Sequence, residues 1–315
     1  MINERINLPL FKKYKNNPIL SPESWPYTAA AVFNPGAIKC DGKTILMVRV
    51  EDMRGFSHLT LARSKDGVTN WKISPSPTFQ SDPAYHEERW GIEDPRIVWL
   101  EDYQTFAMTY VSFSKGGPLV SLALTRDFQE FKRIGCLVPP EDKDACLFPR
   151  KIRDRYLLIQ RPIIRGEKHM WLSFSPDLTH WGEHRILMPT RVGWWDQDKV
   201  GLGPPPIETP EGWLIIYHGV RRTASGNLYR VGMALLDLEE PWKVIRRTPG
   251  WVLAPTEPYE QIGFVPGVIF PNGAVLEENG ELRIYYGAAD SCVALATAKI
   301  DELIDFIKNS RQSQN

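Results

Sequence analysis

The sequence of 315 residues predicts an all-β fold, and three observations support this prediction. The apolar residues come in short runs with alternation that are rich in β-branched and aromatic side chains. Gly, Pro, Asp or Asn bounds each run, as expected where strands end in turns. Apolar residues at helical spacing are clear only near the C-terminus, so helix is the minor element. The clearest predicted strands are residues 44–48, 106–111, 156–159, 213–217 and 282–286.

The predicted strands repeat as one unit along the chain. The unit starts with a Pro-containing segment that leads into two strands joined by a polar turn. This first part occurs at residues 34–49, 94–111, 148–161, 203–218 and 270–287. A third strand follows, then a turn with an Asp and an aromatic residue; the turn residues are Asp66, Asp127, Asp177, Asp237 and Asp301. Five copies of a four-stranded unit predict a five-bladed β-propeller, in which the first strands line a central channel.

A blade cannot bury its apolar faces alone, so residues 1–315 are predicted to form one domain. This domain includes an N-terminal arm at about 1–17 and a short C-terminal helix at about 300–309. Leu303, Ile304 and Ile307 have helical spacing, with Asp301 as the expected N-cap. The turn aspartates are expected to accept backbone N–H hydrogen bonds, and the aromatic residues after them to pack between blades. A two-sheet sandwich is less favoured, because its strands do not recur as two linked motifs.

The composition excludes several classes of function. The 38 Lys and Arg residues balance 38 Asp and Glu residues, so the chain lacks the basic excess of a nucleic-acid-binding protein. No apolar run approaches the roughly 18 residues needed to span a bilayer, and residues 1–14 lack the apolar stretch of a signal peptide. We therefore expect a soluble cytoplasmic protein without nucleic-acid or membrane partners. The four Cys are far apart, with no His at metal-site spacing, which predicts buried thiols rather than a disulfide or metal site.

The repeat predicts which side chains meet at one mouth of the channel. The starts of the first strands supply Asn34, Glu93, Asp94, Arg150, Lys199 and Asn272. The ends of their partner strands supply Arg49, Glu51, Asp52, Tyr110, Arg161, His218 and Asp290. Polar groups in a partly dry channel are costly unless they bind something, so this mouth is predicted to be a pocket for a polar ligand.

The predicted pocket has a basic side and an acidic side. Arg150, Arg161, Lys199 and His218 form the basic side, which suits a phosphate-sized oxyanion. The acidic and amide groups suit sugar hydroxyls. In the alternative, these charges pair with one another and only hold the blades together.

Five segments of the chain resemble glycoside hydrolase family 130. They are Gly91-Ile92-Glu93-Asp94-Pro95-Arg96, Leu147-Phe148-Pro149-Arg150-Lys151, Gly201-Leu202-Gly203-Pro204-Pro205-Pro206, the run from Glu211 to Gly219, and Tyr285-Tyr286-Gly287-Ala288-Ala289-Asp290. The resemblance runs from about Asn17 to Lys308. That family comprises inverting β-mannoside phosphorylases and a smaller set of β-mannosidases on five-bladed propellers, so the resemblance implies this fold and chemistry.

The resemblance also implies roles for individual residues. Asp94 matches the proton donor. The phosphate site of the phosphorylases matches Arg150, Arg161, Lys199 and His218. Asn34, Arg49 and Asp290 match positions near the transferred sugar, and Glu51, Glu93 and Tyr229 are further substrate-binding candidates. The implied activity is inverting cleavage of a β-1,4- or β-1,2-mannoside by inorganic phosphate, giving α-mannose 1-phosphate and a shortened sugar, with no cofactor and no metal.

Two other functions remain open from the sequence. A β-mannosidase on the same fold would need a second carboxylate to activate water, with Glu51, Asp196, Asp198 and Asp290 as candidates. A non-catalytic carbohydrate-binding propeller could stack sugars on residues 25–27 and 192–195. The linkage and the acceptor sugar stay open, and the N-terminal arm and C-terminal helix are natural contacts for a possible homo-oligomer.

Overall fold

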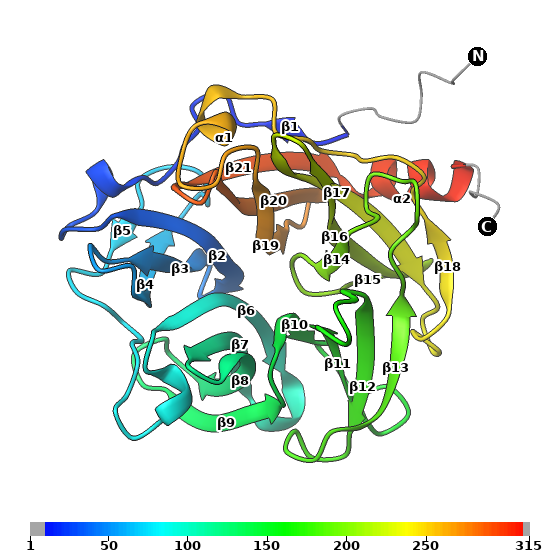
Figure 1. Cartoon of the computed structure of the whole chain (residues 1–315), viewed down its shortest axis with the longest axis horizontal. Helices are drawn as coiled ribbons and strands as arrows, with labels where there is room; N and C mark the ends of the chain where they lie inside the picture. Colours follow the sequence, from blue (N-terminus) through cyan, green and yellow to red (C-terminus); the bar gives the residue numbers. More distant parts are fainter. Residues whose placement is uncertain (1–9, 311–315) are drawn as a thin grey trace.

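The computed structural model describes residues 10–310, and in it the strands form five antiparallel sheets arranged around a central axis (Figure 1). Each sheet is one blade, and its first strand lies nearest the axis. The predicted five-bladed β-propeller is therefore confirmed. All five of the clearest predicted strands are the second strands of their blades.

The blades follow one another along the chain. Blade 1 contains β2 (Ala31–Cys40), β3 (Lys43–Glu51), β4 (Ser57–Ser64) and β5 (Lys72–Ile73). Blade 2 contains β6 (Ile92–Leu100), β7 (Thr105–Ser114), β8 (Gly117–Thr125) and β9 (Lys132–Val138). Blade 3 contains β10 (Asp142–Leu147), β11 (Tyr156–Pro162), β12 (Met170–Ser175) and β13 (Gly182–Met188). Blade 4 contains β14 (Lys199–Leu202), β16 (Gly212–Thr223), β17 (Gly226–Leu236) and β18 (Val244–Arg247), and β15 (Ile207–Thr209) adds a fifth strand by pairing with β16.

The fifth blade is closed by the N-terminal end of the described chain. Its strands are β19 (Ile269–Leu276), β20 (Glu281–Ala288), β21 (Cys292–Lys299) and β1 (Lys12–Lys13), and β1 pairs with β21. Asp301 does not form the turn predicted from the repeat, because it lies inside α2 (Ile300–Asn309), the predicted C-terminal helix. This helix has Lys299 and not Asp301 at its N-cap, and it buries Leu303, Ile304 and Ile307 as its spacing predicted. Residues 1–9 of the expected arm lie outside the described residues, and the single domain over 1–315 stays a prediction.

Lys13 links this closing strand to the segment before β19, which contains the short helix α1 (Pro258–Gln261). Its Nζ donates to the buried Glu260 at 2.5 Å and to the Ala254 carbonyl at 3.0 Å. Lys13→Met leaves the Glu260 carboxylate without its cation, so we expect the free energy of unfolding in urea to fall by roughly 1–3 kcal/mol. Lys12→Met on the same strand is the control, since the Lys12 side chain is exposed. Equal losses in the two variants would contradict this role of Lys13.

The turn aspartates have the predicted structural role in four blades. Asp66, Asp127, Asp177 and Asp237 each accept hydrogen bonds from two backbone N–H groups of their own turn. The aromatic residues after them also pack between blades as predicted. Trp71 meets Tyr285 of blade 5 edge-on at 6.1 Å, and Trp242 meets Phe174 of blade 3 at 5.7 Å.

A β-bulge near the start of the first strand sets the direction of its polar side chain. The register shifts after Phe33 in β2, after Glu93 in β6 and after Lys143 in β10. The bulges hold Asn34, Asp94 and Asp144 at positive φ values of 45°, 51° and 54°. A bulge re-aims a side chain that the regular pleat would direct elsewhere. Asp144, rather than Arg150, is therefore the blade 3 counterpart of Asp94.

Two remaining predictions concern the surface and the environment of the chain. Cys146 and Cys292 are buried as predicted, but Cys136 is exposed, so that prediction is wrong for Cys136. Across residues 10–310 no helix combines the length and apolar composition that crossing a bilayer requires. The cytoplasmic location and the homo-oligomer stay predictions.

Candidate active site

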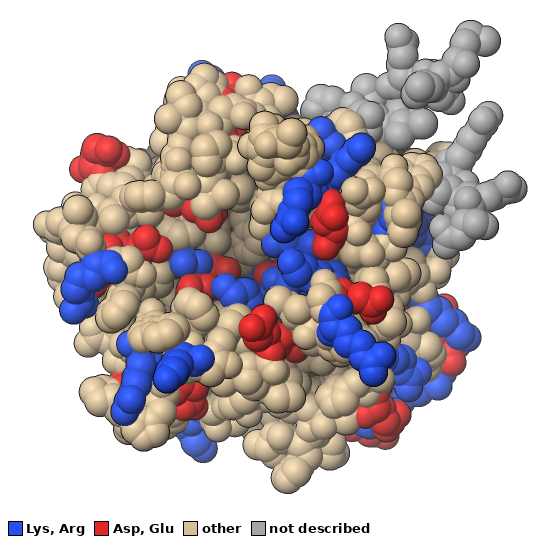
Figure 2. Space-filling view, viewed as in Figure 1, with Lys and Arg blue, Asp and Glu red and all other residues tan. Residues whose placement is uncertain are grey.

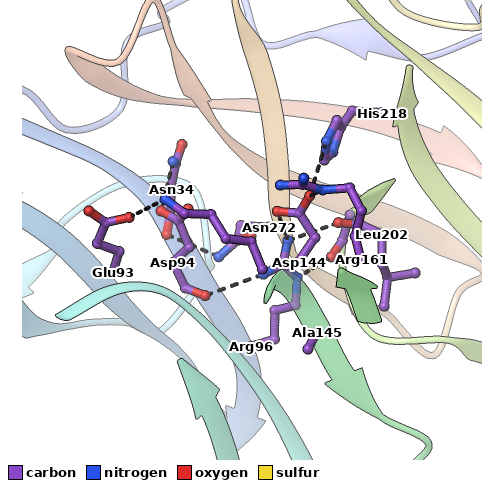
Figure 3. Close-up of polar contacts among 12 residues, drawn as sticks. Asn34, Glu93, Asp94, Arg96, Asp144, Ala145, Arg161, Leu202, His218 and Asn272 are labelled. Atoms are coloured by element: carbon purple, nitrogen blue, oxygen red, sulfur yellow. Dashed lines mark hydrogen bonds and ion pairs between the residues drawn. The ribbon is translucent and has the colours of Figure 1, made fainter. Parts of the chain in front are cut away.

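The first strands and their neighbours bring polar side chains to a hollow in the middle of one face of the propeller (Figure 2). Each blade contributes at least one residue. They are Asn34 and Arg49 from blade 1, Glu93 and Asp94 from blade 2, Lys143, Asp144 and Arg161 from blade 3, Lys199, His218 and Tyr229 from blade 4, and Asp290 from the end of β20 in blade 5. Figure 3 shows the contacts among the residues closest to the axis.

Asp94 lies at the acidic side of the hollow and is only 7% exposed. The Nδ2 of Asn34 donates to its Oδ1 at 2.9 Å, and the Nη1 of Arg49 donates to the same oxygen at 3.1 Å. Burial raises the pKa of Asp94, but the positive charges of Arg49 and Lys143 outweigh burial and hold that pKa below its ordinary value. The Asp94 carboxyl is therefore ionised at pH 7 in this arrangement.

Further carboxylates surround Arg49 and hold its guanidinium in place. Its Nη2 lies 3.2 Å from Glu93 and 3.6 Å from Glu51, and its Nε donates to Ser57 at 2.9 Å. Asp290 lies on the same side. Burial, together with the nearby negative charges of Asp94, Glu51 and Glu93, raises the pKa of Asp290 to about 6, despite the opposing charge of Arg49.

The basic side consists of Arg161 and Lys199. The Nε of Arg161 donates to Asp144 at 2.5 Å, while its two Nη nitrogens make no hydrogen bond to any residue in the described range. The Nζ of Lys199 donates to the Tyr229 hydroxyl at 2.6 Å, and within residues 10–310 it has no carboxylate in ion-pair distance. Burial, with the charge of Arg161, lowers the pKa of Lys199 to about 8. These nitrogens are available for an anion.

His218 lies beside this basic side but does not add a charge to it. Its side chain is fully buried against Phe270, with ring centroids 4.6 Å apart. Burial lowers the pKa of His218 to about 4, although Asp144 opposes that shift. The ring is therefore neutral at pH 7, and it can act only as a hydrogen-bond partner.

Arg150 does not reach the hollow, so the prediction that places it there is wrong. The residue follows the end of β10 remote from Lys143, which pairs with Arg161. Its guanidinium donates to Glu208 at 2.8–3.1 Å and lies over the ring of Trp213. In the predicted repeat a proline stands at the start of the first strand. In blade 3, however, Pro149 lies in the turn after the first strand, so Arg150 is at the wrong end of that strand.

Three residues that the sequence reasoning missed belong to the site. Lys143 bonds Glu93 at 2.9 Å, and Asp144 bonds Arg161. Arg96 is fully buried at the axis and donates to the carbonyls of Leu202 and Gly203 in blade 4, at 2.8 and 2.7 Å (Figure 3). The signal for the first two is the polar run 141–144 ahead of the four apolar residues 145–148, a segment that contains no proline and so does not match the Pro-containing start of the repeat.

Several other candidates have structural roles. Asp52 accepts hydrogen bonds within its own turn, and Tyr110 donates to the buried Glu88. Asp196 is fully buried and is bonded by Arg191 and Arg247, so it has no room for a water to activate. In the two predicted sugar-stacking segments, Trp25 and Trp195 are 7% and 5% exposed, so protein covers most of their rings, whereas Trp194 is 37% exposed and its stacking role stays a prediction.

Comparisons with known proteins agree with this architecture. The sequence profile of a family described as β-1,4-mannooligosaccharide phosphorylase matches residues 3–309. A β-1,4-mannooligosaccharide phosphorylase of Ruminococcus albus is 36% identical over 94% of this chain and 90% of its own length. A β-1,2-mannobiose phosphorylase of Listeria innocua is 38% identical over 80% of this chain and 71% of its own length.

Solved structures place the fold in the same group. The complex of the β-1,2-mannobiose phosphorylase from Listeria innocua with β-1,2-mannobiose superposes with a TM-score of 0.87 at 29% identity. The match covers 95% of this chain and 99% of that one. From the profile match over nearly the whole chain and the shared five-bladed propeller, this protein belongs to glycoside hydrolase family 130.

Proposed function

We propose that this protein is an inverting phosphorylase that cleaves a β-mannoside with inorganic phosphate and releases α-mannose 1-phosphate and a shortened sugar. The observation that carries the proposal is the division of one hollow into two halves. A buried carboxyl, Asp94, stands on one side, and Arg161 and Lys199 stand on the other. Among residues 10–310, the Arg161 Nη nitrogens have no hydrogen-bond partner and Lys199 has no carboxylate within ion-pair distance. The relatives from Ruminococcus albus and Listeria innocua carry the names of mannoside phosphorylases.

This division suits phosphorolysis. An inverting glycosidase needs a carboxylic acid at the leaving oxygen and a carboxylate base that activates water on the opposite face of the sugar. Phosphate is already an anionic nucleophile at neutral pH, so the protein needs only to bind and orient it. In our proposal Arg161, Lys199 and Tyr229 hold phosphate beneath the anomeric carbon, and neutral His218 supports them. Asp94 supplies the proton that the departing sugar oxygen takes.

Asp94 must gain its proton when the ligands bind, because Arg49 and Lys143 hold its pKa below the ordinary value. A phosphate anion adds negative charge to the hollow, and a sugar excludes water from it. Both changes disfavour the carboxylate and raise its pKa. Proton uptake by Asp94 therefore accompanies formation of the reactive complex.

The acidic half is proposed to bind the transferred mannose. Asn34, Arg49 and Asp290 surround Asp94, while Glu93 and Glu51 hold Arg49 by its Nη2. Amide, guanidinium and carboxylate groups together offer the donors and acceptors that sugar hydroxyls need. Glu93 and Glu51 then act on the sugar mainly through the position of Arg49.

The direct test is to incubate the protein with β-1,4- and β-1,2-mannobiose, with and without inorganic phosphate. We expect mannose 1-phosphate of α configuration only when phosphate is present. Free mannose at the same rate in both samples would show a hydrolase and overturn the proposal. Reverse synthesis from α-mannose 1-phosphate and a panel of acceptor sugars then identifies the linkage and the acceptor.

The pKa of Lys199 predicts how phosphate use depends on pH. With a pKa near 8, Lys199 carries its charge below pH 8 and loses it as the pH rises further. The apparent KM for phosphate is therefore expected to rise roughly fivefold between pH 8 and 9, while the sugar KM stays level. Lys199→Arg is the control, because a guanidinium stays charged in this range and removes the rise. A phosphate KM that is flat to pH 9.5 in the unaltered protein would contradict the role of Lys199.

A further inference from the structure

We propose that Asp144 is a positioning residue of the phosphate half, whose buried carboxylate holds Arg161 by its Nε edge and leaves the two Nη nitrogens to bind phosphate. This inference rests on the proposed phosphorylase function. Asp144 is 2% exposed, and its two oxygens lie against Arg161, His218 and Arg96, so we assign it a positioning role and not a direct contact with phosphate. Its effect has to pass through the groups that it contacts.

Asp144 is surrounded by basic groups from three blades. Its Oδ2 accepts from the Nε of Arg161 at 2.5 Å and lies 3.4 Å from the Nε2 of His218, and its Oδ1 lies 3.7 Å from the Nη2 of Arg96. Figure 3 shows Asp144 between Arg96 on one side and the pair Arg161 and His218 on the other. Burial raises the pKa of Asp144, but the charges of Arg161 and Arg96, together with the contact with His218, outweigh burial and hold that pKa well below the ordinary value. The group is therefore a permanent anion.

The backbone around Asp144 is shaped to keep the carboxylate in this place. The residue sits on the bulge of β10 with φ of 54°, a conformation that ordinary side chains rarely adopt. Gly201 of β14 faces it, and a Cβ there would lie 2.2 Å from the Asp144 Oδ2 and 2.6 Å from the His218 ring. Only glycine leaves room for the two groups at this point. Three strands of two blades thus accommodate this one carboxylate.

The geometry of Arg161 explains why this carboxylate serves phosphate binding. A guanidinium offers five N–H donors in a planar fork, and two parallel donors match an oxyanion. Asp144 takes the Nε edge at 2.5 Å. With this edge held, the planar fork is restrained in its orientation. Its free Nη edge is then presented to the ligand at little entropic cost.

The charge of Asp144 also acts on Lys199. The charged groups that face Lys199 are Arg161, Lys168 and Lys143, which lower its pKa, and Asp144, which raises it; the uncharged neighbours are the Tyr229 hydroxyl and neutral His218. Asp144 is the anion in this set. Without it, three cations would push the proton off Lys199 at a lower pH. The carboxylate therefore supports both phosphate-binding groups.

Asp144→Asn and Asp144→Ala separate the effect of Asp144 on the charge of Lys199 from its effect on the orientation of Arg161. Asn keeps the volume and an oxygen for the Arg161 Nε but removes the charge, so the rise in phosphate KM is expected to start about one pH unit lower. At pH 6.5, where Lys199 is still charged, its phosphate KM stays within twofold of the unaltered protein. Ala frees the guanidinium, and its phosphate KM rises at least tenfold at every pH, while the sugar KM changes less than twofold.

Asp142→Asn is the matched control on the same strand. Asp142 is equally buried, and burial raises its pKa to about 8, so the side chain is already neutral at pH 7. The isosteric amide is expected to leave both KM values and the pH profile unchanged at pH 6.5–7.5. Isothermal titration of inorganic phosphate into each variant measures the same effects without turnover, and thermal melts confirm that each variant is folded.

The outcomes distinguish the two proposals. If the unaltered protein neither binds phosphate nor forms mannose 1-phosphate, the proposed function fails. If it does both, but the Asp144 variants raise the sugar and phosphate KM values equally or keep the pH profile, Asp144 is only structural and this inference fails. If Asp144→Ala melts below the assay temperature, the isosteric Asp144→Asn decides alone through its pH profile.

Discussion

Asp94→Asn is expected to lower kcat for phosphorolysis of mannobiose by about 10³-fold, within the range typical of a lost general acid. Asn has the same volume, and its amide oxygen can still accept the hydrogen bond from Asn34 that Asp94 accepts at 2.9 Å. It has no proton to give to the departing sugar oxygen. Initial rates at saturating phosphate and sugar measure the effect, and the melting temperature checks the fold.

An aryl β-mannoside with an acidic phenol as leaving group is the control substrate. Its phenolate leaves without protonation, so Asp94→Asn should slow this reaction far less than it slows mannobiose cleavage. Equal losses on both substrates would mean that Asp94 only shapes the pocket. More than a tenth of the original activity on mannobiose would likewise remove Asp94 from the role of acid.

Arg161→Met is expected to raise the apparent KM for phosphate by about 10²-fold, because two charge-assisted hydrogen bonds to one anion are lost. The sugar KM should change less than threefold, since Arg161 stands in the half opposite Asp94. Met retains most of the apolar volume of the side chain, which limits the damage to packing against Asp144 and His218. The two KM values are measured separately, each with the other substrate at saturation.

Arg150→Met is the matched control for this substitution. Arg150 was also a phosphate candidate from sequence, but its guanidinium is bonded to Glu208 and its side chain is 38% exposed. The variant should keep both KM values within about twofold, because a partly exposed ion pair contributes little. A phosphate KM that rises as much in Arg150→Met as in Arg161→Met would contradict the site described above.

The repeat and the alternation of apolar residues were sufficient to predict the propeller, because both are local properties of the chain. A strand that buries one face has alternating apolar and polar residues in its own sequence. The fifth blade shows the limit of this reasoning. Its outer strand is formed by Lys12 and Lys13, which pair with β21 from the opposite end of the chain. Nothing near Asp301 in the sequence indicates a partner nearly 300 residues away.

The residues of the candidate site also include some that sequence motifs indicate and others that only the structure places there. Asp94, Arg161, Lys199 and His218 could be named from motifs, and the structure brings them to one hollow. Arg150 was misplaced and Asp144 was missed, since the bulge in β10 decides which residue of the third blade faces the axis. The register of β10 is set by its pairing with β11, and the positions of prolines in the sequence do not reveal that register.

From the sequence alone came the five blades, the carboxyl of Asp94 and most of the cations, because repeated strands and short motifs depend on neighbouring residues. The tertiary structure decided how the ring closes and the charge state of each group. It also decided that Asp144, and not Arg150, is the residue of blade 3 that faces the axis. His218 is neutral and Lys199 titrates near pH 8 only because the fold removes both from water beside other charges. Burial and distance between charges set these properties, and both exist only once the blades have assembled.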